Sequence, residues 1–536
     1  MASERASTGA AGGPSNGSGG RTAGNVLFIT LDQWRGDSLS ALGHPLVKTP
    51  TLDALAAKGV LFANHWANAA PCGPSRASLY TGMYPQNHRS VLNGTPLDAR
   101  FTNIALEARA LGYDPVLFGY TDTSVDPRTV PPGDPRLRTY EGVLPGFRAI
   151  VNDPYELGGP SEWAKWLADR GRDVPSDLRR LYDPDLSYPG ASDHPPAWAP
   201  GHFGPDETET AFLTDKLIDW LETHGDEPFF VHASYIRPHP PYRNPPGYHD
   251  LYSLDDVPPF VAHASREKEQ AMHPLNNVLL TLPPLAAPDD EAERRQIRAT
   301  YHGMQREVDD QLARLFAWLD ESGAADDTLV VLTSDHGEMG GDHWCFQKAG
   351  YWDESYHIPL LIHDPRPAAD GTRGLVVRDV TESVDVTPTI LAWLGADVPV
   401  QVDGWPLTKW LEEGTRPEHW RTEAHFEWDF RHPVVKLGER YFAIPSAHCV
   451  LNVVRSDRYK YVQFAAESDI LPPLLFDHES DPGELTDVSR SADYATTAWE
   501  FTQKLLRWRM RNDERTLTGQ FLDPTNGHVV SEDIWR

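Results

Sequence analysis

Val26-Leu27-Phe28-Ile29-Thr30-Leu31 is followed at once by Asp32-Gln33. The six residues form a continuous apolar run, which is typical of a parallel strand buried on both faces of a sheet. A polar pair directly after such a strand lies at its carboxyl end, where open α/β sheets bind their ligands. This stretch therefore predicts an α/β fold and one part of a functional site.

Strand-like runs with helical patterns between them continue over the following 330 residues. The runs are Pro115–Tyr120, Pro228–Tyr235, Thr328–Ser334 and Ile358–His363, and the helical patterns cover residues 50 to 59, Glu207–Thr223 and Glu291–Ser322. Alternating β and α elements predict a mainly parallel central sheet with helices on both faces. We expect this large α/β domain to cover residues 25–403.

The ends of the chain and one internal segment differ in composition from this pattern. Residues 1–24 are rich in Gly, Ser and Ala and are expected to form a disordered leader. Residues 122–205 are rich in Pro, Asp and Gly and have one helical pattern near Ser161–Arg170. We interpret this segment as an excursion over the sheet edge that covers the site or contacts another subunit.

Residues 404–536 are expected to form a small antiparallel α+β subdomain followed by a tail. The evidence is a set of short strand patterns and one helical pattern: Tyr441–Ile444, Val450–Val454, Tyr459–Phe464 and Leu475–Asp477, then the helix Ala498–Asn512. The turn Arg455-Ser456-Asp457-Arg458 joins two of these strands.

The charge of the chain restricts its partners. The 536 residues contain 78 acids and 48 bases, a formal charge of −30. Such a surface repels phosphates, which argues against a nucleic acid or an anionic membrane as partner. No apolar run reaches the length of a membrane span. The three cysteines, Cys72, Cys345 and Cys449, provide no disulfide framework, and we expect a cytoplasmic location.

A second informative stretch reads Cys72-Gly73-Pro74-Ser75-Arg76-Ala77-Ser78-Leu79-Tyr80-Thr81-Gly82. It fits the pattern C-x-P-S-R-x-S-[LM]-x-T-G throughout. The alternative is a buried cysteine before an ordinary helix, but seven fixed positions in eleven residues are improbable by chance. At a helix start, Cys72 lies beside the positive end of the helix dipole, and Arg76, one turn on, can stabilise an oxyanion.

Two polar pairs stand where strands end. Asp32-Gln33 is one, and Asp335-His336, which follows the apolar run Leu329–Leu332, is the other. Singly, each is more often a cap or turn residue. Together they offer oxygen and nitrogen ligands at one edge of the sheet, a set that suits Mn²⁺ or Zn²⁺ better than Ca²⁺. The sequence therefore predicts one divalent metal site.

Two further residues are suited to an anionic substrate. His239 stands between prolines directly after the strand that ends at Tyr235 and is a candidate general acid for a leaving oxygen. Lys348, twelve residues past His336, is a point charge suited to a sulfuryl or phosphoryl oxygen. Taken alone, each is more often an ordinary loop residue.

With these motifs, residues 25 to about 518 resemble the formylglycine-dependent members of the alkaline phosphatase superfamily, namely the sulfatases and, most closely, the phosphonate monoester hydrolases, which are also phosphodiesterases. The residues that carry the resemblance are Cys72–Gly82, Asp32-Gln33, Asp335-His336, Asn87-His88-Arg89, Gly119-Tyr120-Thr121, Arg237-Pro238-His239-Pro240-Pro241 and Glu427-Trp428-Asp429-Phe430-Arg431.

The resemblance implies that Cys72 is oxidised to formylglycine by a formylglycine-generating enzyme before folding is complete, and that the hydrated aldehyde is the nucleophile. It implies one metal, with Mn²⁺ favoured and Zn²⁺ or Ca²⁺ as alternatives, and a tetrameric assembly. The implied metal ligands are Asp32, Gln33, Asp335, His336 and the modified Cys72; the implied catalytic residues are Cys72, Arg76, His239 and Lys348; the implied substrate contacts are Asn93, Tyr120, His239 and Lys348.

One departure from the family pattern concerns the substrate. Relatives read Gly-Tyr-Thr-Thr-Thr where this chain has Gly119-Tyr120-Thr121-Asp122-Thr123, so Asp122 is expected beside the substrate. A carboxylate there favours a substrate with a cationic group or lowers the affinity for dianions.

Three functions follow from these residues and the resemblance. The first is hydrolysis of phosphonate monoesters and phosphodiesters with promiscuous cleavage of sulfate monoesters. The second is an arylsulfatase or alkylsulfatase that uses the same residues. The third, of a different class, is a non-catalytic anion-binding protein whose Cys72 stays unmodified.

Overall fold

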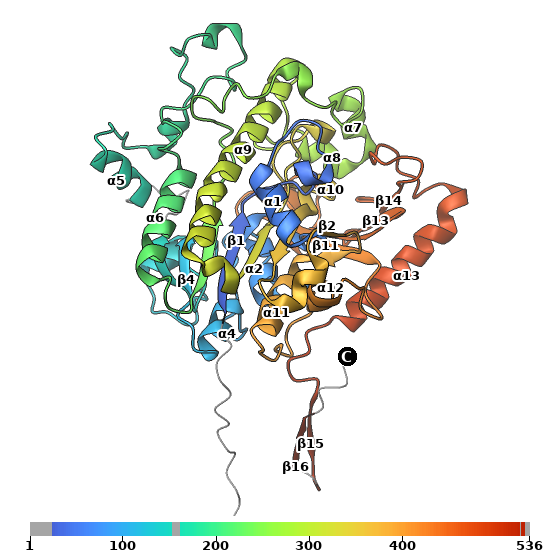
Figure 1. The fold of residues 1–536 in the computed structure, drawn as a ribbon. Helices are drawn as coiled ribbons and strands as arrows, with labels where there is room; N and C mark the ends of the chain where they lie inside the picture. The colour runs from blue at the N-terminus through green and yellow to red at the C-terminus, as the bar shows by residue number, and fades with distance from the viewer. Residues whose placement is uncertain (1–23, 153–160, 526, 531–536) are drawn as a thin grey trace, which may run out of the picture.

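A nine-stranded sheet forms the centre of the molecule in a computed structural model that describes residues 24–152, 161–525 and 527–530. Its strand order is β10-β2-β8-β7-β1-β6-β4-β5, with β9 paired to β2 (Figure 1). Most neighbours are parallel, whereas β8 runs antiparallel to both β2 and β7. The expected α/β fold with a mainly parallel sheet is confirmed.

The strands of this central sheet are β1 (Asn25–Leu31), β2 (Val60–Trp66), β4 (Val116–Gly119), β5 (Arg148–Asn152), β6 (Phe230–Tyr235), β7 (Thr328–Ser334), β8 (His357–His363), β9 (Leu375–Val377) and β10 (Thr381–Glu382). The longer helices in the described residues are α1 (Pro50–Lys58), α2 (Cys72–Thr81), α5 (Glu162–Asp169), α6 (Glu209–His224), α9 (Glu291–Ser322), α11 (Val386–Trp393) and α13 (Ala495–Arg511). The shorter ones are α3 (Pro85–His88), α4 (Ile104–Ala110), α7 (Arg266–Met272), α8 (Pro274–Leu279), α10 (Asp353–Tyr356) and α12 (Thr408–Glu413).

Helices cover both faces of the sheet, and the side chains of β1 alternate between the two layers. Leu27, Ile29 and Leu31 pack into a cluster with residues of α1, α5, α6 and α9. Val26 and Phe28 pack into a second cluster with residues of α2, α4, α11 and α12. All seven residues of β1 are buried, as the apolar run predicts.

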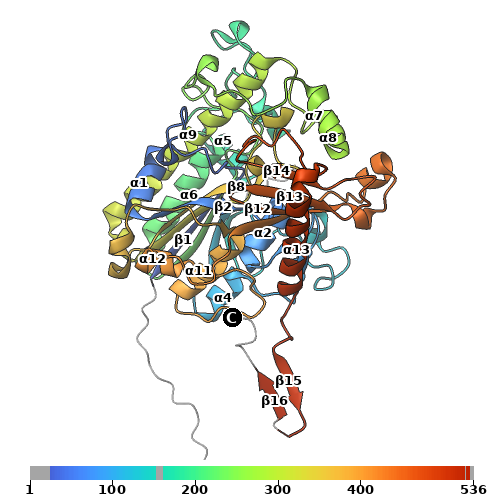
Figure 2. The same cartoon turned by 90° about the vertical axis from the view of Figure 1, so that its right-hand side faces the viewer.

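A smaller, five-stranded sheet lies beside the first one. Its order is β14-β13-β12-β11-β3, with strands β11 (Glu423–Asp429), β12 (Val450–Ser456), β13 (Tyr459–Phe464), β14 (Leu474–Asp477) and β3 (Ala69–Ala70). The four C-terminal strands are antiparallel, and α13 packs against β12 and β13 (Figure 2). The small antiparallel sheet expected near the C-terminus is therefore present, but β3 joins it from the residues just before Cys72, in parallel with β11.

Several local predictions were wrong or incomplete. Tyr441–Ile444 is not a strand: Gly438–Phe442 forms a π-helical turn that ends at Ala443, whose φ is +55°. Strands β2, β5 and β11 were not predicted. Residues 122–205 place β5 on the edge of the central sheet as well as helix α5. The expected disordered leader lies outside the described residues, apart from Gly24.

A two-stranded hairpin at the C-terminal end extends away from the rest of the molecule. It consists of β15 (Gln520–Asp523) and β16 (Gly527–Val530), and both views show it below the main body (Figures 1 and 2). In the described part of the chain, none of the helices combines the length and the apolar character needed to cross a membrane.

Candidate active site

Three elements bring the predicted site residues to one edge of the central sheet. β1 and β7 are parallel neighbours, with Leu31 paired to Ser334, so the residues that follow them, Asp32 and Asp335, emerge side by side. Helix α2 begins at Cys72 and points its first residue at the same edge. The convergence expected from the strand ends and the cysteine motif is present.

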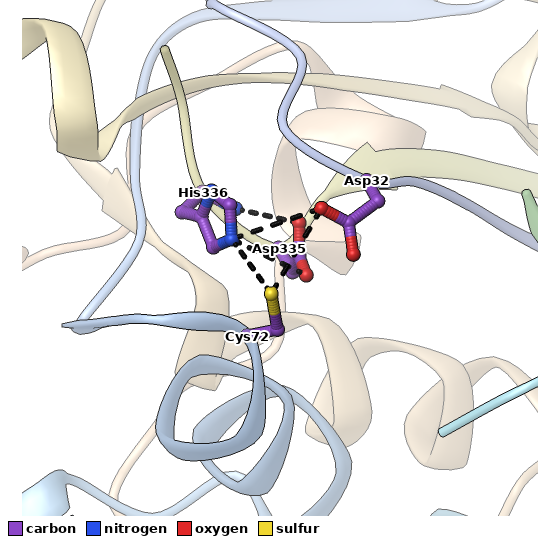
Figure 3. A group of neighbouring side chains, drawn as sticks. All are labelled: Asp32, Cys72, Asp335 and His336. Carbon is purple, nitrogen blue, oxygen red and sulfur yellow. Dashed lines mark hydrogen bonds and ion pairs between the residues drawn. The ribbon is translucent and has the colours of Figure 1, made fainter. Parts of the chain in front are cut away.

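Asp32, Cys72, Asp335 and His336 form a compact, buried group (Figure 3). The Sγ of Cys72 lies 3.1 Å from Nε2 of His336 and 3.9 Å from Oδ1 of Asp32. The same Nε2 lies 3.8 Å from Oδ1 of Asp32 and 3.7 Å from Oδ2 of Asp335. Each of the four side chains therefore presents a ligand atom to one small volume.

This group fits a divalent cation. One ligand atom from each of the four residues lies within 4.8 Å of the other three. Two carboxylates buried this closely repel each other unless positive charge lies beside them. Carboxylate oxygens with one imidazole nitrogen suit Mn²⁺ or Zn²⁺. Asp32, Cys72, Asp335 and His336 are thus the residues that would hold the metal.

Arg76 donates hydrogen bonds to both carboxylates of the group, Asp32 and Asp335. Its side chain is fully buried, Nε donates to Oδ2 of Asp335 at 2.9 Å, and Nη2 donates to Oδ2 of Asp32 at 3.1 Å. Nη1 also donates to Oγ of Ser234 on β6. The Tyr120 hydroxyl donates to Oδ2 of Asp32 as well, and Arg76 stacks on the Tyr120 ring. These contacts fix the orientation of the two carboxylates.

Gln33 lies beside the group, between Lys348 and Glu338. The Lys348 ammonium donates to Oε1 of Gln33 at 2.7 Å, and Nε2 of Gln33 donates to Glu338. Glu338 is fixed in turn by the Tyr242 hydroxyl and by the backbone N–H of Gln347. The predicted ligand oxygen of Gln33 is thus adjacent to Lys348, and its role as a ligand stays a prediction.

The environment of Cys72 keeps its thiol neutral. Burial, together with the charge of Asp32, raises the pKa of Cys72 well above its ordinary value. A thiolate nucleophile requires the opposite shift. For Asp32, burial alone would raise the pKa, but His336, Arg76 and Lys348 hold it below its usual range.

The group opens into a cavity of about 510 Å³. It is lined by Asp32, Pro71, Cys72, Asn93, Tyr120, Asp122, Tyr140, Glu141, Ile236, His239, Pro240, Pro241, Pro284, Gln347 and Lys348. All the residues that the sequence assigns to substrate binding are in this lining. Oδ1 of Asn93 accepts from the backbone N–H of Gly73 at 2.8 Å, and Nδ1 of His239 lies 2.7 Å from the Pro240 carbonyl oxygen.

Several residues of the site were not singled out from the sequence. Glu338 holds Gln33, the Ser75 hydroxyl donates to the backbone oxygen of Asp335, and Glu141 lines the cavity. Ser75 lies in the Cys72–Gly82 pattern and Glu338 lies two residues after His336, so their position beside predicted ligands was the available signal. Glu141 had no such signal, because it lies in a loop that only the tertiary fold brings to the cavity.

Comparison with known proteins places this geometry in a family. A family model described as sulfatase matches residues 24–396, and one described as N-sulphoglucosamine sulphohydrolase, C-terminal, matches residues 341–511. A multifunctional alkaline phosphatase superfamily protein, PehA, of Trinickia caryophylli is 40% identical over 93% of this chain and 97% of its own length. An arylsulfatase of Clostridium perfringens is 27% identical over 92% of this chain and 96% of its own.

Two solved structures share the fold over nearly the whole chain. The phosphonate monoester hydrolase of Agrobacterium radiobacter has a TM-score of 0.88 and 45% identity, covering 95% of this chain and 100% of that one. The phosphonate monoester hydrolase of Silicibacter pomeroyi has a TM-score of 0.87 and 38% identity, covering 95% and 99%.

Proposed function

The chain belongs to the sulfatase family, and from that premise we propose that it hydrolyses phosphonate monoesters and phosphodiesters, with promiscuous hydrolysis of sulfate monoesters. The observation that carries the proposal is the placement of Cys72, at the start of α2, against Asp32, Asp335 and His336. The likeness to two phosphonate monoester hydrolases over 95% of the chain supports the choice of substrate.

The nucleophile in this proposal is formylglycine made from Cys72. The hydrated aldehyde would supply two hydroxyls: one would bond to phosphorus or sulfur as the alcohol leaves, and the other, on losing its proton, would re-form the aldehyde as the carbon–oxygen bond to the phosphonate, phosphate monoester or sulfate breaks. A divalent metal, with Mn²⁺ favoured, would be held by Asp32, Gln33, Asp335, His336 and the modified Cys72; when bound, it lowers the pKa of a hydroxyl and offsets substrate charge.

The other residues of the cavity bind and orient the anion. The Lys348 ammonium supplies a positive charge to a non-bridging oxygen, and Asn93 and Tyr120 line the same space. His239 holds a proton for the leaving oxygen. The Pro240 carbonyl accepts a hydrogen bond from Nδ1 of His239, so Nε2 is the nitrogen left to face the leaving oxygen, and it carries a proton to donate only when the ring is an imidazolium. Arg76 keeps Asp32 and Asp335 in position.

Charge favours substrates with one negative charge. Gln33 contributes a neutral amide where a third carboxylate would add repulsion, and Lys348 donates to it. Phosphonate monoesters, phosphodiesters and sulfate monoesters carry one negative charge and have similar tetrahedral shapes, so one electrostatic site stabilises all three transition states. Phosphate monoesters, as dianions, are expected to be poorer substrates.

The test compares a 4-nitrophenyl phenylphosphonate with a 4-nitrophenyl sulfate on Mn²⁺-loaded protein. Because the leaving group is shared, the ratio of kcat/KM reports differential stabilisation of the two transition states. We expect the phosphonate to be preferred by roughly tenfold or more, about 1.4 kcal/mol. A Cys72→Ala variant is the control and should lose both activities. A preference for the sulfate would contradict the proposal.

Two alternative functions, a sulfatase and a non-catalytic anion-binding protein, can be distinguished from the proposed one by experiment. A sulfatase is supported by the family model and by the arylsulfatase relative, and a preference for the sulfate ester identifies it. A non-catalytic anion-binding protein predicts an unmodified Cys72. Conversion to formylglycine makes the Cys72 peptide about 18 Da lighter, so mass spectrometry of protein from its native source separates this alternative from either enzyme.

We also propose a formylglycine-generating enzyme as maturation partner, a homo-oligomer as the assembly and a cytoplasmic location. The Cys72–Gly82 pattern supports the first. The three cysteines support the last, since all are buried free thiols.

A further inference from the structure

The loop that carries His239, residues 236–244, is held by an arginine that has no part in the proposed chemistry. Arg237 comes two residues after the end of β6 and is only 4% exposed. Its Nη1 donates to the backbone carbonyl oxygen of His239 at 2.9 Å and to that of Pro241 at 2.8 Å. One nitrogen, with its two hydrogens, therefore ties together two carbonyls of this loop, and the first of them belongs to His239 itself.

Two residues from other elements fix the guanidinium of Arg237. Its Nη2 lies 3.6 Å from Oε2 of Glu209, the first residue of α6. Its Cζ lies 4.5 Å from the centre of the Tyr182 ring, which is a cation–π distance. The side chains of Arg237 and Glu209 are 5% and 14% exposed, so little water screens their attraction. The guanidinium is thus held by a carboxylate and an aromatic face while it binds the loop.

Tyr182 belongs to the segment 122–205 and is itself firmly packed. The ring centres of Trp163 on α5 and of Phe203 lie 5.8 Å and 5.4 Å from its own, and all three side chains are buried. The backbone oxygen of Tyr182 also accepts a hydrogen bond from Nε of Arg243, at 3.1 Å. The segment 122–205 therefore contacts the His239 loop at two points, through the ring of Tyr182 and through its carbonyl.

The orientation of the His239 ring depends on the backbone that Arg237 holds. Nδ1 of His239 lies 2.7 Å from the carbonyl oxygen of Pro240, the residue between the two carbonyls that Arg237 binds. The N–H of His239 donates to the Ile236 carbonyl at 2.9 Å. A shift of this backbone carries the ring with it. A general acid must lie within hydrogen-bond distance of the leaving oxygen, and a misplacement of about 1 Å can cost roughly 100-fold in rate.

The contacts of Arg237 require the shape of a guanidinium and not only its charge. A lysine keeps the positive charge but presents a single nitrogen at the end of a flexible chain. It cannot bind two carbonyls, pair with Glu209 and lie flat on the Tyr182 ring at the same time. Substitution by lysine therefore separates the positioning effect from the effect of charge.

We infer, building on the proposed function, that Arg237 is a positioning residue for protonation of the leaving oxygen. It holds the carbonyls of His239 and Pro241 so that Nε2 of His239 faces the leaving alcohol, and Glu209 and Tyr182 hold Arg237 in turn. As the bond from phosphorus to the leaving oxygen breaks, that oxygen keeps the electron pair and takes the proton from Nε2. Arg237 acts through His239, since it is not among the described residues that line the cavity.

The test compares two esters that differ in their need for a proton, 4-nitrophenyl phenylphosphonate and phenyl phenylphosphonate. 4-Nitrophenolate leaves readily without protonation, whereas the more basic phenolate depends on a general acid. With metal-loaded, formylglycine-containing protein, we expect Arg237→Lys to lower kcat/KM roughly 30-fold or more for the phenyl ester. For the 4-nitrophenyl ester we expect a loss of roughly threefold or less. A merely structural role would lower both values equally.

Two further variants connect this effect to His239. His239→Asn removes Nε2 and should show the same selective loss on the phenyl ester. Adding Arg237→Lys to His239→Asn should lower kcat/KM little further, because the two residues act as a unit. Glu209→Gln removes the charge that pairs with Arg237 and should give a smaller loss in the same direction, roughly three- to tenfold, even if Arg237→Lys fails to fold.

Arg421→Lys is the matched control. Arg421 is also a buried arginine, with a side chain 11% exposed, and it pairs with Glu382 and Asp385. None of these three residues is among those that line the cavity. Arg421→Lys should change kcat/KM for the two esters by the same factor. A thermal melt of each variant verifies that it is folded.

The outcomes separate this inference from the function on which it rests. Equal losses on the two esters in Arg237→Lys, with both still hydrolysed by the wild-type protein, overturn the inference and leave the function standing. A second large, selective loss when Arg237→Lys is added to His239→Asn would show that Arg237 does not act through His239, and this also overturns the inference. Failure of the modified, metal-loaded wild-type protein to hydrolyse either ester overturns the function and the inference together.

Discussion

At the scale of single residues, Arg76 holds the site together by a geometry that only a guanidinium provides. Nε and Nη2 donate to two different carboxylates, Asp335 and Asp32, while Nη1 reaches β6. A lysine at this position keeps the charge but has a single nitrogen and cannot reproduce the fork. Arg76 is thus a positioning residue in addition to any direct effect on the nucleophile.

We predict that Arg76→Lys weakens Mn²⁺ binding by roughly 10- to 100-fold, because the two carboxylates lose their shared anchor. Metal affinity is measured by calorimetric titration of metal-free protein, alongside kcat/KM at saturating metal and a thermal melt to verify folding. Tyr120→Phe is the comparison, since it removes only the hydroxyl that donates to Asp32. An unchanged metal affinity with a lower kcat/KM would mean that Arg76 acts on the nucleophile instead.

At the scale of elements, a buried ion network joins the small sheet to the large domain. Lys460 on β13 is fully buried, and its ammonium donates to Asp353 on α10 and to Glu484 in the turn after β14. The pair with Asp353 measures 2.9 Å. Removing the lysine leaves Asp353 with Arg455 and Glu484 with His478 as the remaining partners in the network. Loss of the buried ammonium is therefore more costly than loss of an exposed pair.

The expected cost of Lys460→Met is roughly 3–5 kcal/mol in the free energy of unfolding. Lys504→Met is the matched control: Lys504 also pairs with a glutamate, Glu423, but its side chain is 42% exposed, and about 1 kcal/mol or less is expected. Denaturant titrations of both variants test the difference. Similar losses in the two variants would show that the network does not couple the sheets.

The strands that could be predicted are those whose burial produces a clear hydrophobic pattern in the sequence. Strands buried on both faces, such as Val26–Leu31 and Thr328–Ser334, are unbroken apolar runs and were located to within a residue. Strand β2 was missed because its register shifts between Phe62 and His65, which breaks the pattern. Strand β11 was missed because Glu423, Glu427 and Asp429 resemble a polar loop.

The site itself was predictable where its residues follow strands or lie in the cysteine motif. Asp32, Asp335 and Cys72 meet because parallel neighbours end at one edge, which the order of elements already implies. The approach of the loops that contain Asp122 and Glu141 was not predictable, since it depends on the hydrogen bond from the Thr123 N–H to the Gly142 carbonyl, between residues with no periodic pattern. The hydrogen bond from Lys348 to Gln33 likewise appears only in the tertiary structure.

At the scale of the whole molecule, the C-terminal arm, residues 517–525 and 527–530, projects from the rest of the described residues and exposes apolar side chains. Leu517, Phe521 and Leu522 are 75%, 62% and 78% exposed. Apolar side chains this exposed on a two-stranded hairpin are unfavourable in an isolated protomer, since such a hairpin is marginally stable alone. We propose that the arm packs on a second copy of the chain within the expected homo-oligomer.

Removal of the chain after Thr516 is predicted to reduce the assembly by at least a factor of two in mass, measured by light scattering coupled to size-exclusion chromatography. The double variant Phe521→Ser and Leu522→Ser should act in the same direction. Val434→Ser, at a site 84% exposed elsewhere on the surface, is the control. A truncated protein with the mass of the full-length one would contradict the role of the arm.

The pairing of β3 with β11 can form only late in translation, because the two strands are far apart in the sequence. Ala70, two residues before Cys72, pairs with Trp428, so this pairing cannot form until the ribosome has made roughly 350 further residues. At translation rates of about 5–20 residues per second, that interval lasts roughly 20–70 s. During this interval β11 has not yet paired with the strand that precedes Cys72, and the formylglycine-generating enzyme that we propose as a partner would have this time to reach the nascent chain.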